Sequence, residues 1–250
     1  GGGSYCYDSD KPTGWINMKV AEQRTTEWRD IQQKNGLSSF ALKMIAIFTM
    51  TIDHMGFILF PQALWMRGIG RLAFPIFCFT LTEGFSHTHD LKRYIQRMLV
   101  VGLLSEIPFN LAESGQIFSI EHQNVFFTLL IGLIMLHYCE KVSGNAMKAE
   151  VVIVAMFAAE FLHTDYGALG VLLIGIFWFT REHKWYQALL VGGWNFLFGI
   201  PIQYAGIFAI LPIALYNGKK GRSTGYFFYL YYPVHLLILY GISRMIVIGR

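Results

Sequence analysis

Apolar runs of about 15 to 22 residues follow one another from Phe40 to Ile248. Helical runs of this length match the thickness of a bilayer, whereas a soluble domain would interleave its apolar stripes with polar faces. The runs are bounded by charge, Gly or Pro, and they predict helices at residues 39–60, 67–88, 91–112, 123–141, 147–163, 167–180, 185–199, 201–217 and 225–248. We therefore expect an all-α, polytopic transmembrane bundle of about nine helices.

The connections between these helices alternate in charge. Lys and Arg gather after the second, fourth, sixth and eighth predicted helices, whereas Glu113, Glu121 and Asp165 mark the alternate connections. Basic loops stay on the cytoplasmic side of a membrane. The pattern therefore predicts a cytoplasmic N-terminus, an outer C-terminus, and one membrane domain over residues 37–250.

A polar tail precedes that domain. Residues 1–36 have no long apolar core and no signal-peptide pattern, and Gly1 to Ser4 resemble an added linker. We expect a solvated extension, partly helical around Ala21 to Gln33, and assign it no chemistry.

Composition agrees with a membrane protein. Hydrophobic residues make up 54% of the chain and charged residues 14%, against about a quarter charged in soluble domains. The net charge of +4 lies in short loops, where topology explains it, so nucleic acid is not expected as a partner. Cys6, Cys78 and Cys139 share no spacing, so neither a disulfide framework nor a metal site is expected.

Ionisable groups inside the predicted helices indicate where chemistry is possible. Such a group costs about 2.5 to 3.5 kcal/mol in mid-membrane, so it needs a partner or a function. Asp53 and His54 lie toward the outer end of the first helix, and neighbouring helical residues point about 100° apart, so Asp53 cannot orient His54 directly. His54 is a candidate general base with a partner on another helix, or else a core histidine bonded to a carbonyl.

Two arginines lie one turn apart in the second predicted helix. Arg67 and Arg71 face the same way and repel, unless an anionic ligand or carboxylates share their site. A phosphate or pyrophosphate fits the guanidinium fork. Alternatively, Arg67 is an interfacial charge and Arg71 belongs to a buried pair. Pro75 is expected to kink this helix.

Four further polar residues complete the candidates. Glu106, near the outer end of the third helix, is the expected partner of Arg71 or His54, in a catalytic role or a structural ion pair. Asn110 lies one turn beyond it, and Glu83 lies further toward the cytoplasm. His235 is a second candidate base or donor, with simple packing as the alternative.

Several short motifs occur in order along the membrane domain. They are TIDHMG at 51–56, RGIGRLAFPIF at 67–77, TEG at 82–84, SEIPFN at 105–110, NVFFTL at 124–129, DYG at 165–167, YNGK at 216–219 and YPVHL at 232–236. With these motifs, the stretch from Leu42 to Ile248 resembles the TraX family of bacterial membrane proteins, named for the conjugative pilin acetylase. Asn110 stands where many relatives have Asp.

The resemblance implies acyl transfer in a bacterial cytoplasmic membrane. The donor would be acetyl coenzyme A, and the acceptor in the founding member is the amino terminus of a pilin. For this chain the acceptor stays open among a peptide amino terminus, a glycan and a small molecule, and a homodimer is possible. The resemblance supports His54 as the base and Arg67 and Arg71 as contacts to the donor or the developing oxyanion.

With the residue arguments added, two sets are predicted. The catalytic set is His54, Asp53 and Glu106, and the donor-binding set is Arg67, Arg71, Glu83, Asn110 and His235. A proton-coupled transporter or channel, with Asp53, Glu83 and Glu106 as its relay, is the main alternative. A noncatalytic assembly partner, whose polar residues only join helices, is the third.

Overall fold

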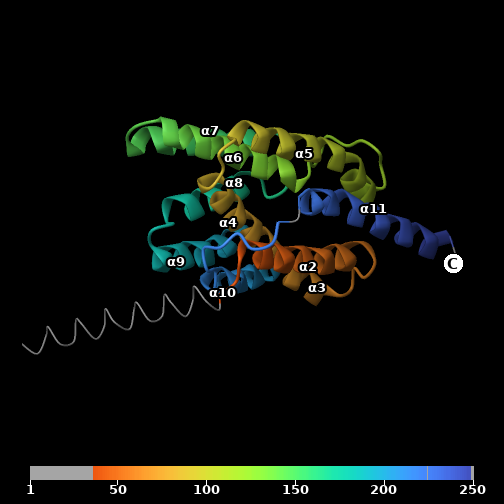
Figure 1. Ribbon diagram of the computed structural model, residues 1–250. Coiled ribbons are helices and arrows are strands. Elements are labelled where there is room, and N and C mark those ends of the chain that lie inside the picture. The colour runs from red at the N-terminus through yellow and green to blue at the C-terminus, as the bar shows by residue number, and fades with distance from the viewer. Residues whose placement is uncertain (1–35, 224, 249–250) are drawn as a thin grey trace, which may run out of the picture.

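Helices make up nearly all of the computed structural model, which describes residues 36–223 and 225–248 (Figure 1). The helices are α2 (Ser39–Ile58), α3 (Leu64–Gly70), α4 (Ala73–Ser86), α5 (Leu91–Ser114), α6 (Val125–Lys141), α7 (Asn145–Phe161), α8 (Gly167–Phe179), α9 (Lys184–Trp194), η1 (Asn195–Phe198), η2 (Pro201–Ala209), α10 (Ile210–Ala214) and α11 (Phe227–Ile248). Every predicted helical segment is confirmed. The predictions for the linker, for Cys6 and for a helix around residues 21–33 lie outside the described residues.

Local chemistry explains where several helices begin and end. The Ser38 hydroxyl accepts a hydrogen bond from the Ala41 amide and begins α2, and the Asn124 side chain does the same for α6 through the Phe126 amide. Asp90 begins α5 by accepting from the Arg93 amide. Gly115 ends α5 with a φ of 72°, which a side chain would strain.

The second predicted helix, which Pro75 was expected to kink, is interrupted one turn before that proline. The α-helical hydrogen bonding is interrupted after Gly70, where the amides of Arg71 and Leu72 bond to carbonyls three residues back. Pro75 lies in the first turn of α4, directly after this interruption, where its missing N–H leaves no bond unmade.

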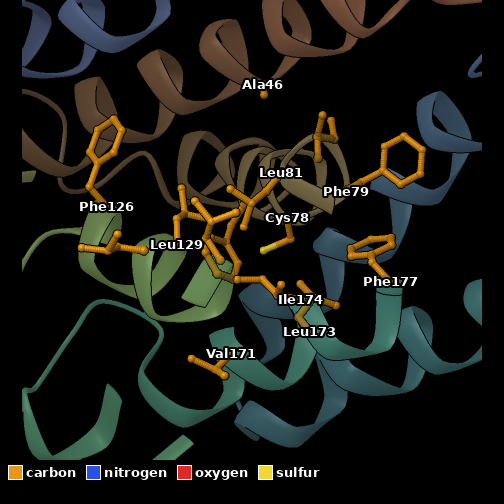
Figure 2. Packing of buried hydrophobic residues seen from close by; sticks show 14 of the residues in the cluster. Ala46, Cys78, Phe79, Leu81, Phe126, Leu129, Val171, Leu173, Ile174 and Phe177 are labelled. Atoms are coloured by element: carbon orange, nitrogen blue, oxygen red, sulfur yellow. The ribbon is translucent and has the colours of Figure 1, made fainter. Parts of the chain in front are cut away.

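The core surrounds α4, which runs through the middle of the molecule and packs against α2, α6, α8 and η2 (Figure 1). Cys78 and Leu81 of α4 lie close to Leu129 of α6 and Ile174 of α8 (Figure 2). Cys78 and Cys139 are free and buried, as small hydrophobes would be. Because α4 is buried on several sides, its position is fixed, and its first residues lie beside the functional site described below.

The outward faces of the helices are apolar. Phe157 and Phe161 on α7 are 73% and 82% exposed, and Leu104 on α5 is 61% exposed. Monomeric soluble proteins rarely expose apolar surface of this extent. In the described part of the chain, three helical stretches are long and apolar enough to cross a membrane, namely Ser39–Ile58, Leu64–Ser86 and Phe227–Val247. The chain is a multi-pass membrane protein.

Connections predicted for the same side of the membrane lie together. The amides of Ser39 and Phe40 donate to the carbonyls of Lys219 and Lys220, which joins the start of α2 to a basic connection. At the opposite end, Asp165 donates its amide to the carbonyl of Gln123, so the two acidic connections meet. We call these two ends the inner and the outer end, following the predicted topology.

Candidate functional site

A polar crevice of about 170 Å³ opens near the outer end of the bundle. It lies between α2, α3, the start of α4, the end of α5, α11 and the connection before α8. We call it the outer crevice. Its polar lining is Asp53, His54, Arg67, Arg71, Glu113, His122, Asp165, Tyr166 and Tyr232.

One carboxylate holds both arginines. Asp53 lies 2.7 Å from Nη1 of Arg67 and 2.8 Å from Nη2 of Arg71. Gly70 makes this approach possible, because a Cβ there would overlap the Asp53 side chain. Of the arrangements expected for the two arginines, the structure shows the shared carboxylate, and Asp53 accordingly does not orient His54.

The two guanidinium groups differ in how many donors remain. Arg71 also donates from Nε to the Arg67 carbonyl and from Nη1 to the Tyr166 hydroxyl, so all three of its nitrogens are engaged. Arg67 contacts Asp53 through Nη1 alone, and its guanidinium covers the ring of Phe57. Within residues 36–223 and 225–248, Nε and Nη2 of Arg67 have no hydrogen-bond partner. Arg67 therefore has N–H groups to offer a ligand, whereas Arg71 supports Asp53 and Tyr166.

His54 has the partner from another helix that its position required. Its Nδ1 lies 2.6 Å from Nε2 of His235 on α11. Nδ1 of His235 lies 2.9 Å from the carbonyl oxygen of Tyr231, which can only accept, so that nitrogen carries the proton. In a neutral pair, Nε2 of His235 is then the acceptor and Nδ1 of His54 the donor. Nε2 of His54 is left unprotonated, as a general base requires.

Tyr166 forms one wall of the crevice, and the sequence did not reveal its role. Its ring stacks on Phe74 at 3.7 Å between centroids, and its backbone is left-handed, with a φ of 65°. A tyrosine in this conformation is uncommon and is a frequent mark of functional sites. The DYG motif at 165–167 gave only the location of this residue.

The acidic connections form the rim. His122 lies 2.7 Å from the Glu113 carboxylate and 4.0 Å from Asp165. The hydrogen bond to Glu113 raises the pKa of His122 above its ordinary value. Sequence reasoning missed Glu113 and His122, because a charged residue in an outer loop is ordinarily solvated.

The expected pairing of Glu106 was wrong. Its carboxylate accepts from both the backbone amide and the side-chain amide of Asn124, and it does not line the outer crevice. The loop before α6 folds back onto α5 and leaves amide donors there that need an acceptor. Asn110 is buried on the same helix, also away from the crevice lining.

Glu83 belongs to a different place. It lines a separate cavity at the inner end, with Arg181, Lys184 and Tyr216. Among the predicted residues, the structure therefore brings together Asp53, His54, Arg67, Arg71 and His235. The three acids proposed for a proton relay lie in three different surroundings.

Comparisons with known proteins give a consistent result. A family model described as TraX protein matches residues 38–243. The probable fimbrial assembly protein FimC, serogroup H1, of Dichelobacter nodosus is 30% identical over 234 residues, covering 81% of this chain and 94% of that protein. An uncharacterized protein of Rickettsia prowazekii is 27% identical over 169 residues, covering 66% and 60%. Protein TraX of Escherichia coli is 27% identical over 136 residues, covering 54% and 53%. No solved structure matches.

Proposed function

Because the chain belongs to the TraX family, we propose that it is a membrane acyltransferase that moves an acetyl group from acetyl coenzyme A to an amine or hydroxyl acceptor. The observation that carries the proposal is the outer crevice, where an unprotonated nitrogen of His54 shares one space with the free donors of Arg67. The protein would act in a bacterial cytoplasmic membrane.

His54 would act as the base. The acceptor nitrogen or oxygen attacks the carbonyl carbon of the thioester while Nε2 of His54 removes its proton. When the tetrahedral intermediate collapses, the carbon–sulfur bond breaks, and the departing coenzyme A thiolate takes that proton from His54. His235 keeps His54 in the required tautomer through the hydrogen bond between the rings.

Arg67 would stabilise the oxyanion. Its unused N–H groups can donate to the developing negative charge, and each such donor is worth about 3 kcal/mol elsewhere. Asp53 and Arg71 hold Arg67 in position, since Asp53 bonds to both guanidinium groups. Arg71 is therefore assigned a positioning role.

The acceptor would enter from the outer end. Glu113 and Asp165 at the rim give that entrance negative charge, which favours an acceptor carrying an amine. A peptide amino terminus, a glycan and a small molecule all fit this chemistry. One relative's name refers to fimbrial assembly, which puts peptides first among the acceptors to test.

The test is acetyl transfer by the purified chain. Release of coenzyme A from acetyl coenzyme A is followed with peptides, amino sugars and small amines as acceptors. His54→Ala is expected to lower the rate by about 10² to 10⁴, the range that acid–base catalysis contributes. His89→Ala, which changes an exposed histidine outside the crevice, is the matched control. A rate that His54→Ala leaves unchanged removes His54 as the base, and no transfer to any acceptor refutes the proposed function.

A further inference from the structure

A second cavity, of about 330 Å³, opens at the inner end of the bundle. Its walls come from the start of α2, from α5 and α11, and from the connection after α10. Four cations line it, namely Lys43, Arg97, Lys220 and Arg222. We call it the inner cavity.

Within residues 36–223 and 225–248, the four cations of the inner cavity have no countercharge. Among the residues that the structure describes, the lining contains no Asp or Glu and none of the four cations forms an ion pair. Positive-inside topology accounts for Arg97, Lys220 and Arg222, which are exposed. It does not account for Lys43, which is half-buried in α2 with its ammonium 5.7 Å from the ring of Phe228. Unpaired cations converging on a cavity are suited to a polyanion.

The inner cavity lies directly behind the outer crevice. Four side chains line both spaces, namely Met50, Phe77, Val125 and Tyr232. We call these four the septum. It holds no charged residue, so an uncharged chain could pass between its side chains without burying a charge. Movement of a few side chains would join the two cavities.

The spacing along α2 matches a known carrier. Lys43 and His54 are eleven residues apart on this helix, which is about 16 Å at a rise of 1.5 Å per residue. The arm between the pyrophosphate and the sulfur of coenzyme A has about 13 bonds in a line, or about 15 Å when extended like a polypeptide. That arm consists of amide and methylene groups and carries no charge.

From these observations we propose that the inner cavity binds the phosphates of the acyl donor, and that the arm crosses the septum to bring the thioester to His54. This inference rests on the proposed function and adds the residues that would hold the donor. Lys43 is the deepest phosphate contact, and Arg97, Lys220 and Arg222 surround the opening. Phosphate on an anionic lipid is chemically similar, so the experiment separates the two sources.

Binding tests the proposal without any chemistry. The chain is placed in nanodiscs of zwitterionic lipid only, and coenzyme A, pantetheine and inorganic pyrophosphate are titrated by calorimetry. We expect the variant R97Q/K220Q/R222Q, which changes exposed residues, to weaken coenzyme A binding at least 10-fold and to leave pantetheine binding unchanged. The matched control K92Q/K141Q/K148Q removes equal charge elsewhere and should change coenzyme A affinity less than 2-fold. Equal weakening by both variants would reduce the effect to general electrostatics and overturn the proposal.

A second arm tests the lipid. Repeating the titration in nanodiscs with phosphatidylglycerol should leave coenzyme A affinity within about 2-fold. If phosphatidylglycerol displaces coenzyme A, and the triple variant abolishes phosphatidylglycerol enrichment in native mass spectra, the cavity is a lipid site and the proposal fails. His54→Ala should bind coenzyme A normally. If His54→Ala abolishes transfer but R97Q/K220Q/R222Q leaves coenzyme A affinity unchanged, this inference is overturned and the proposed function stays intact.

The septum has its own test. Val125 is half-buried at the start of α6, and Val125→Trp adds bulk between the two cavities. We expect pyrophosphate to bind this variant as it binds the natural chain, while coenzyme A loses at least 10-fold in affinity. Unchanged affinity for coenzyme A would mean that the arm does not cross here.

Discussion

The outer crevice and the inner cavity both contain clustered cations, but the two clusters differ in the countercharge that the described residues supply. In the outer crevice, Asp53 lies within hydrogen-bond distance of both Arg67 and Arg71. In the inner cavity, Lys43 and its neighbours face one another, and the part of the lining that the structure describes contains no carboxylate. Under the proposed function, Asp53 would hold the two arginines in place before substrate arrives, whereas the inner cations would keep their attraction for a ligand. In this proposal, the same kind of charge would serve positioning at one end and recognition at the other.

Removing the outer carboxylate should have the largest effect. Asp53→Ala leaves two guanidinium groups together with no counterion, and breaking a buried pair from one side costs about 3 to 5 kcal/mol. Thermal unfolding in detergent should fall to a clearly lower temperature. Lys43→Gln is the comparison, and it should leave the ligand-free protein equally stable or more stable, because it removes repulsion. Equal destabilisation by the two variants would break the contrast between the cavities.

Arg67 should separate chemistry from donor binding. Arg67→Gln is expected to lower kcat by about 10² to 10³, as loss of one oxyanion donor does elsewhere, with little change in KM for acetyl coenzyme A. The inner variant R97Q/K220Q/R222Q should do the reverse and raise KM at nearly constant kcat. Steady-state kinetics of both variants measures kcat and KM. If Arg67→Gln raised only KM, Arg67 would be reassigned to donor binding.

His235 should act through the tautomer of His54. His235→Phe removes the acceptor for Nδ1 of His54 and is expected to lower kcat by about 10-fold to 100-fold, part of the contribution of acid–base catalysis. His235→Gln keeps an acceptor oxygen and should recover most of that loss. The pH profile of kcat should shift in His235→Phe, because His54 then loses its fixed proton. A purely structural role would give equal losses in both variants and an unchanged pH profile.

His122 should give the smallest effect, visible only as a function of pH. Its raised pKa means that the folded chain holds this proton more tightly than the unfolded chain. The resulting stabilisation is complete below about pH 6.5, the ordinary value for histidine, and it disappears as the pH rises through the raised value. The melting temperatures of the natural chain and His122→Gln should therefore differ at pH 5.5. They should converge when the pH exceeds the raised pKa of His122. A difference that grows with pH would contradict the assignment.

Sequence patterns predicted the bundle well, because helix length and loop charge depend on neighbouring residues only. They also identified Asp53, His54, Arg67, Arg71 and His235 as residues that need a partner, since an ionisable group in an apolar run is costly wherever its helix lies.

The patterns failed where the answer depended on another element. Glu106 has the same chemistry as Asp53, and its sequence position alone made it an equally good partner for Arg71. The loop before α6 places Asn124 beside Glu106 instead, and the Asn124 amide donates to the Glu106 carboxylate. Glu113 and His122 enter the site only because that loop returns to the outer crevice.

By itself, the sequence determined that this chain is a helical membrane protein and which of its polar residues need partners. Only the tertiary structure decided which partners they have, because the break after Gly70 and the packing of α11 beside α2 bring together residues far apart in the chain. Hydropathy measures the cost of a charge in its own helix. The compensation for that cost comes from neighbouring helices, and only their packing in three dimensions determines it.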